Sequence, residues 1–195
     1  RISTVEKSDK NKAVQKHRKY MRRATLIWML IMATILITAI FTIMGYSIRR
    51  YKQDYYSNFL RFCDVTSENI TNYSENNPDE DIFQSYLPQA LEKSANGMGI
   101  FLYVFDADGN CVLSSSNVEA SNDEIKMSPE MLSVIRKDGT YQTDHTAGKF
   151  DPTIAEPMFC CGSVMTIQES GAETTYYLFA MSYTRALNGY TTDIL

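Results

Sequence analysis

The chain has 195 residues, 44% of them hydrophobic, 12% aromatic and 22% charged, which is ordinary for a folded protein. This length excludes two full hydrophobic cores and leaves room for one compact domain with an anchor. The net charge of −4 combines +7 at residues 1–23 with −11 on the rest of the chain. The acidic remainder argues against nucleic acid as a partner, and the opposite signs suggest two different compartments.

Residues 24–48 form an uncharged, mostly apolar segment of 25 residues. As a helix it would reach ~37 Å, which is enough to cross a hydrocarbon core of ~30 Å. A cleaved signal peptide is the alternative, but its apolar region is usually ~7–15 residues long and is followed by a cleavage site. The segment therefore predicts a transmembrane helix, with membrane lipid as a partner.

Basic residues flank this segment and are denser on its N-terminal side. That side has Lys16, Arg18, Lys19, Arg22 and Arg23, and the other has Arg49, Arg50 and Lys52. An excess of cations favours the cytoplasmic side of a membrane. We therefore expect residues 1–23 to be a basic cytoplasmic tail and residues 49–195 to be extracytoplasmic, at the cell membrane.

Thr34, Thr38 and Thr42 repeat on one face of the predicted transmembrane helix. Small residues at this spacing let two helices approach closely, so this face is a candidate contact in a homodimer. Alternatively, each hydroxyl bonds the carbonyl four residues before it in its own helix. The sequence leaves both interpretations open.

Beyond the membrane segment, the helical period continues to about Tyr73. Its apolar side forms a stripe of Ile48, Tyr51, Tyr55, Phe59, Phe62, Thr66 and Tyr73. We expect this stripe to pack against the domain or against a partner helix.

A second helix is predicted to begin at Asn77, because Asn is a good N-cap and Pro78 and Glu80 suit the first turn. Pro88 is expected to interrupt this helix. The short helix that follows is expected to end at the Asn96-Gly97 pair.

After residue 99 the pattern becomes strand-like, with one further helix from Ser128-Pro129 to Gly139. The predicted strands are residues 100–106, 111–116, 141–145, 158–168 and 175–183. A hairpin loop containing Gly171 joins the last two strands. These elements predict an α+β fold, in which short helices flank a five-stranded antiparallel sheet.

The order of elements resembles the extracytoplasmic PAS-like sensor domains, of the single Cache or PDC type, in bacterial membrane sensor histidine kinases. The resemblance is carried by helix 48–73, by the strand-turn-strand F-L-Y-V-F-D-A-D-G-N-C-V-L-S-S and by the closing strand T-Y-Y-L-F-A-M-S. It implies a sensor domain at residues 49–190, and residues 191–195 would then lead to a second transmembrane helix.

The resemblance also implies a function, namely the signal-input region of a two-component receptor. Such a region transmits an extracytoplasmic stimulus by helix movement, and the kinase's own catalytic domains would lie downstream. Chemotaxis receptors and membrane cyclases carry similar outer modules. A membrane-anchored binding protein without signalling is a further alternative.

A ligand pocket on such a sheet would draw its lining from the central strands and their rims. The candidates are Tyr103, Phe105, Ser114, Tyr141, Tyr177 and Phe179. Aromatic strand residues also pack as core, so each has both interpretations. Acidic clusters at residues 75–81 and 119–124 are typical of solvated loops, with binding of divalent cations, polyamines or cationic peptides as the alternative. A small-molecule or cationic ligand is compatible with the sequence but is not identified by it.

Other motifs are weaker. Asp106, Asp108 and Asn110 match the opening of a calcium loop, but Cys111 and Asn117 stand where Gly and Glu are required. A hairpin turn explains these residues better. His145 follows Asp144, but lone histidines are usually structural. We expect no metal, no cofactor and no catalytic site in this segment.

The four cysteines are Cys63, Cys111, Cys160 and Cys161. An even count outside the cytoplasm permits disulfides. However, Cys63 lies on a predicted helix, and Cys160 and Cys161 point to opposite faces of a strand. Two interpretations remain open: the cysteines are free thiols buried as small hydrophobic residues, or two of them form one disulfide.

Overall fold

The structure is a computed structural model that describes residues 2–143, 150–156, 158–169 and 171–183. It divides into two compact units, residues 1–51 and 52–195. The last predicted segment, residues 191–195, and His145 both lie outside the described residues.

The first unit is helical and belongs to α1, which runs from Ile2 to Asn76. In the described part of the chain, this helix is the one long and apolar enough to cross a membrane. Its apolar side chains are exposed, as those of Trp28 (66%) and Phe41 (70%) show. The hydroxyls of Thr34, Thr38 and Thr42 donate to the carbonyls four residues earlier. This satisfies the hydroxyls within the helix, so their polarity requires no second helix.

The second unit contains the end of α1 and a five-stranded sheet, as predicted. The sheet is wholly antiparallel, with strand order β2-β1-β5-β4-β3. The remaining elements are α2 (Tyr86–Met98), β1 (Phe101–Phe105), β2 (Cys111–Ser114), η1 (Asn122–Glu124), α3 (Pro129–Asp138), β3 (Thr140–Thr143), β4 (Met158–Glu169) and β5 (Ala172–Tyr183).

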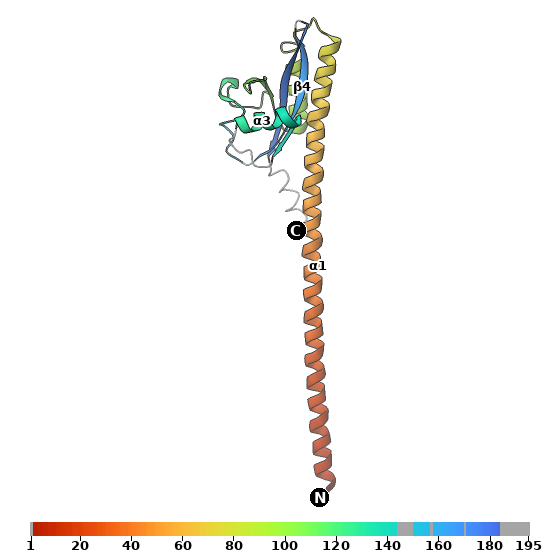
Figure 1. Ribbon diagram of the computed structural model, residues 1–195. Coiled ribbons are helices and arrows are strands. Elements are labelled where there is room, and N and C mark those ends of the chain that lie inside the picture. Colours follow the sequence, from red (N-terminus) through yellow and green to blue (C-terminus); the bar gives the residue numbers. More distant parts are fainter. Residues whose placement is uncertain (1, 144–149, 157, 170, 184–195) are drawn as a thin grey trace. The chain divides into compact units, whose positions relative to one another are not determined.

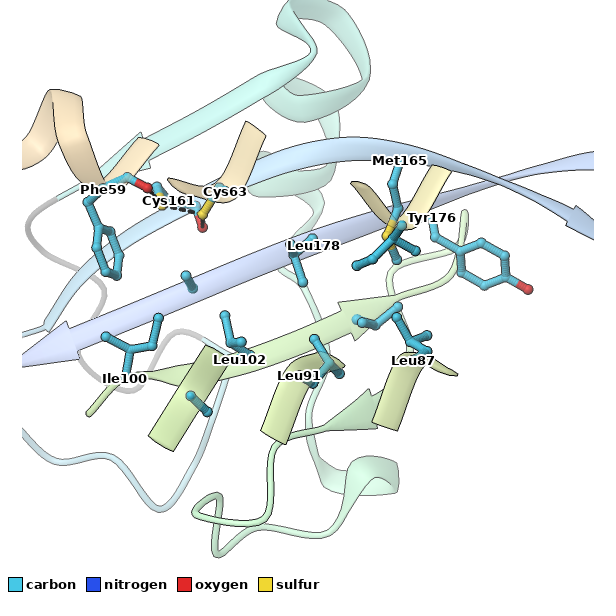
Figure 2. Close-up of a cluster of buried hydrophobic side chains, with 14 of the residues drawn as sticks. Phe59, Cys63, Leu87, Leu91, Ile100, Leu102, Cys161, Met165, Tyr176 and Leu178 are labelled. Carbon is cyan, nitrogen blue, oxygen red and sulfur yellow. Dashed lines mark hydrogen bonds between the residues drawn. The ribbon is translucent and has the colours of Figure 1, made fainter. Parts of the chain in front are cut away.

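Alternating residues of the strands build a separate hydrophobic core on each face of the sheet. The first core joins the sheet to α1 and α2, through residues such as Phe59, Leu91 and Leu178 (Figure 2). The second core lies on the side covered by α3 and by residues 150–154 (Figure 1). The sheet is therefore the middle layer of three, and two different sets of elements hold its two faces.

The α1 stripe packs against the first face of the sheet, as expected. Phe59 is 3% exposed and its ring lies 5.3 Å from that of Phe159 on β4. The ring of Tyr56 stacks on Phe159 at 4.1 Å. Tyr51, which belongs to the first unit, is 41% exposed.

Gly162 on β4 permits a close approach in the second core. It lies opposite Phe179 of β5, and a Cβ at this position would come within 2.6 Å of the Phe179 ring. Tyr141 of β3 flanks the same glycine on its other side. The absence of a side chain at residue 162 therefore makes room for a fully buried aromatic ring.

The predicted helix beginning at Asn77 is wrong. Residues 77–85 form turns, and α2 begins at Tyr86. The Asn77 side chain donates to the carbonyl of Tyr73, so it caps the helix that ends rather than one that begins. The Glu80 carboxylate accepts the Tyr73 hydroxyl at 2.9 Å instead of joining a capping box.

The predicted interruption at Pro88 is also wrong. Pro88 occupies the third position of α2, in the first turn, where a missing backbone N–H leaves no helical bond unmade. The helix passes the Asn96-Gly97 pair and ends at Gly99, whose φ of 63° is left-handed. The predicted ends of α3 are confirmed, since Ser128 caps it and Gly139 closes it.

Candidate functional site

The six residues predicted from sequence to line a pocket gather on the second face of the sheet. Tyr103 and Phe105 come from β1, Tyr177 and Phe179 from β5. Tyr141 packs against the same core. Ser114 lies opposite Tyr103 in the β1–β2 pair and donates to the Asn122 side chain at 2.7 Å.

Most of these side chains are closed off from solvent. Tyr103, Phe105 and Phe179 are each 0% exposed. Phe150 covers all three, with its ring centroid 5.1 Å, 5.4 Å and 5.9 Å from theirs. In the present arrangement these aromatic groups are core, and a direct ligand role for the six stays a prediction.

An open hollow of about 740 Å³ lies beside this core, at the start of β1 and the end of β5. This size is in the range of small-molecule sites. The two loops at 117–119 and 151–156 form its sides. Its lining consists of Phe101, Asn117, Val118, Glu119, Asp151, Thr153, Ile154, Ala155, Glu156 and Tyr183.

Asp151 joins the hollow to the predicted residues. Its Oδ2 accepts the Tyr103 hydroxyl at 2.7 Å, and its Oδ1 accepts the backbone N–H (2.9 Å) and the hydroxyl (2.6 Å) of Thr153. Burial, and then the bond to Asp151, raise the pKa of Tyr103 far above its usual value, so Tyr103 remains a donor. The carboxylate is thus held in a fixed orientation.

The described lining of the hollow is acidic. Asp151 is 2% exposed, and its contacts among the described residues are hydrogen bonds from uncharged donors. A carboxylate has about four acceptor positions, of which these bonds occupy three. Glu119 and Glu156 also line the hollow. Such an arrangement can accept a hydrogen-bonded cation from solvent.

A second hollow, of about 510 Å³, lies beside the turns after α1. It too is acidic, being lined partly by Asp79, Glu80, Asp81 and Glu169. Hydrogen bonds from Ser85 and Tyr73 lower the pKa of Glu80. This carboxylate is satisfied by its own neighbours, and the flanking Asp79 and Asp81 are exposed, so we regard the first hollow as the better candidate.

The Asp106 motif forms a turn, as expected. Asp106 Oδ1 accepts the backbone N–H groups of Asp108 and Asn110, each at 2.9 Å. Gly109, at φ 84°, completes the turn. Over the described ranges no three His, Cys, Asp or Glu side chains converge as metal ligands would.

The sequence predictions missed Asp151, which is the residue that orders the hollow. Its partner Tyr103 is 48 positions away, and no short motif records such a contact. The available signal was the local pattern Asp151-Pro152-Thr153, because an Asp that binds the residue two positions on is a common turn.

No protein-family profile matches the sequence, and no curated protein matches it significantly. Solved structures do match. The ligand-binding domain of the Campylobacter jejuni chemoreceptor Tlp3, in complex with 4-methylisoleucine, has a TM-score of 0.56 at 12% identity. The match covers 75% of this chain and 58% of that chain.

The sensory domain of the same chemoreceptor with isoleucine bound gives a TM-score of 0.56 at 12% identity, covering 75% of this chain and 59% of the other. Its complex with L-valine gives 0.55 at 12% identity, covering 75% and 59%. The chain thus spans less than two thirds of the structures it matches. The likeness establishes the fold, an α+β architecture around a five-stranded antiparallel sheet.

Proposed function

We propose that this chain is the signal-input region of a membrane receptor and that it recognises a small ligand bearing an ammonium group. The observation that carries the proposal is the buried Asp151 carboxylate, which lines a hollow of ligand size and meets only uncharged donors among the described residues. An ammonium group would supply a positive charge and a further hydrogen bond to this carboxylate.

The apolar part of the hollow narrows the ligand class. Phe101, Val118, Ile154 and Tyr183 line it together with the carboxylates. This combination suits a ligand with one charged end and a small hydrocarbon portion, such as an amino acid or a simple primary amine. The folds that resemble this one hold isoleucine and L-valine, which are ligands of this kind.

The route of transmission in this proposal is α1. This helix is continuous from Ile2 to Asn76, and its Lys52–Asn76 portion packs on the sheet. A ligand that shifts the sheet would therefore shift α1, and with it the apolar segment at residues 24–48. Residues 49–195 would be extracytoplasmic and residues 1–23 cytoplasmic, with a homodimer as the working assembly.

For the output, we propose a two-component sensor histidine kinase, following the resemblance of the element order. A chemoreceptor is the second candidate, favoured by the identity of the similar structures. Both use the same kind of input region. The downstream sequence of the receptor distinguishes them, since a kinase requires a phosphoacceptor histidine and an ATP-binding domain after a second membrane helix.

Ligand recognition is tested by thermal unfolding of the full chain in detergent, with proteinogenic L-amino acids and simple primary amines added one at a time. A compound that binds the folded state raises the melting temperature, by an amount that grows with the logarithm of its concentration divided by its Kd. Asp151→Asn should weaken binding of the best compound by about 10- to 100-fold, the cost of a lost charge-assisted bond. The amide retains the shape of the carboxylate, so the fold should survive.

Two controls make this test specific. Asp79→Asn removes a carboxylate from the second hollow and should leave the affinity unchanged. The deaminated analogue of the best compound should fail to bind the unaltered chain. Equal binding by the Asp151→Asn variant would place the ligand elsewhere, and no stabilisation by any of these compounds would remove support for an ammonium ligand.

A further inference from the structure

Two of the four cysteines, far apart in the sequence, meet in the first core. Cys63 lies on α1 and Cys161 on β4, 98 positions later, and both are 0% exposed. Figure 2 shows their sulfur atoms facing each other between the helix and the strand. Both residues belong to the second unit, so this contact is internal to the folded domain.

The contact between the two thiols is unusually close. The sulfur atoms are 2.6 Å apart. Each thiol's contact with a carbonyl oxygen is longer, at 3.8 Å from Cys63 Sγ to the Cys161 oxygen and 3.4 Å from Cys161 Sγ to the Phe59 oxygen. Sulfur is larger than oxygen, so two unbonded thiols would be expected to stand farther apart than these pairs, not nearer.

The other two cysteines lie in the opposite core. Cys160 is next to Cys161 but belongs to the opposite core, as the alternation of a strand requires. Cys111 also lies in the second core, where burial raises the pKa of its thiol to about 12. Cys63 and Cys161 therefore meet because the fold brings α1 and β4 together, although the two residues are 98 positions apart.

We propose that Cys63 and Cys161 are a disulfide-forming pair that fastens α1 to the central sheet. The bond forms when both S–H bonds break and one S–S bond is made. A disulfide of the thiol–disulfide exchange type, such as glutathione disulfide, takes up the two electrons and two protons and leaves as two thiols. This proposal does not depend on any ligand.

Burial determines when the bond forms and how long it lasts. Neither sulfur is accessible once the helix has packed on the sheet, so the exchange takes place before this core closes. Burial, with Cys63 beside it, also raises the pKa of the Cys161 thiol, which suppresses the reactive thiolate. In the folded protein the pair is therefore a lasting structural link rather than a reversible switch.

The link has a direct consequence for the helix. It joins α1 to β4, an inner strand of the sheet, and it encloses α2, β1, β2, η1, α3 and β3 in one covalent loop. Closing so long a loop restricts the unfolded chain strongly. The oxidised protein should melt roughly 10 °C above the reduced protein.

The experiment uses the full chain in detergent, reduced and unfolded, then refolded in a glutathione redox buffer. The product is denatured with N-ethylmaleimide, and its adducts are counted by mass spectrometry. The expected result is two adducts, on Cys111 and Cys160, and a proteolytic fragment that joins Cys63 to Cys161. Four adducts, or a fragment joining any other pair, would overturn the proposal.

Variants provide a second measurement. Cys160→Ser should keep the linked fragment and the difference in melting temperature between oxidised and reduced protein. A Cys63→Ala, Cys161→Ala double variant should lose both while remaining folded, because alanine fits where the buried thiols were. An oxidation-dependent melting temperature in the double variant would assign the bond to other cysteines.

Discussion

Phe59→Ala is expected to lower the free energy of unfolding of the outer domain by about 3–5 kcal/mol. The ring is 3% exposed and stacks near Tyr55, at 5.9 Å, as well as meeting Phe159 edge-on. Its removal leaves a cavity between α1 and the sheet that the stiff strand cannot fill. A loss of this size is a large part of the stability of a small domain.

The measurement is denaturant unfolding of the full chain in detergent, followed by a tertiary-structure signal. Val65→Ala is the matched control, because Val65 is on the same helix but 45% exposed, and its effect should be within about 0.5 kcal/mol. Phe62 is half-buried and should give an intermediate loss. Equal effects at residues 59 and 65 would mean that the helix does not pack on the sheet as described.

The second large effect concerns signalling, through the register of α1. One residue inserted between Ser47 and Ile48 rotates the following helix by about 100° relative to the apolar segment. In the full-length receptor this should change ligand sensitivity by the size of a typical coupling, about 5- to 150-fold. A transmitter that works by rotation or by helix packing must respond to such a change.

A seven-residue insertion at the same point is the control. It restores the helical facing to within ~20° while lengthening the helix by about two turns. Output should therefore change far less than after the single insertion. If both insertions leave the response to ligand as it was, α1 is a passive tether, and an anchored binding protein without signalling becomes the better description.

The elements that the sequence predicts well are those whose signals are local. The Ser128-Pro129 start and Gly139 end of α3 depend on backbone chemistry within a few residues, and the structure confirms both. The strands near residues 101–105 and 158–169 follow from runs of apolar residues. The α+β fold class follows from the order in which the predicted helices and strands occur along the chain.

The wrong prediction of a helix start at Asn77 arises because contacts with side chains outside the local motif determine the conformation there. Asn77 is a residue type that favours the start of a helix, but its side-chain amide donates a hydrogen bond to the carbonyl of Tyr73 instead. Tyr73 is itself held by stacking on Tyr86, 3.7 Å away. This packing folds the intervening residues into turns, and no helix-start rule includes such a contact.

The candidate site shows the same limit. The predicted strands contain Tyr103, Phe105, Tyr177 and Phe179, and the structure places these four side chains on one face of the sheet. It did not show that Phe150 covers that face and that the open hollow lies beside it. Loop residues carry the decisive chemistry here, and their positions depend on contacts that no periodicity records.

A sensor of the outside medium requires the acidic domain and the basic segment to lie on opposite sides of the membrane. The direct test is labelling of intact cells with a membrane-impermeant thiol reagent, using Ser121→Cys in the exposed loop of the domain and Ser8→Cys in the basic segment. The four native cysteines are buried and should give little background. We predict labelling at residue 121 and none at residue 8 until the cells are opened. Labelling at residue 8 but not at residue 121 would reverse the topology and contradict the account.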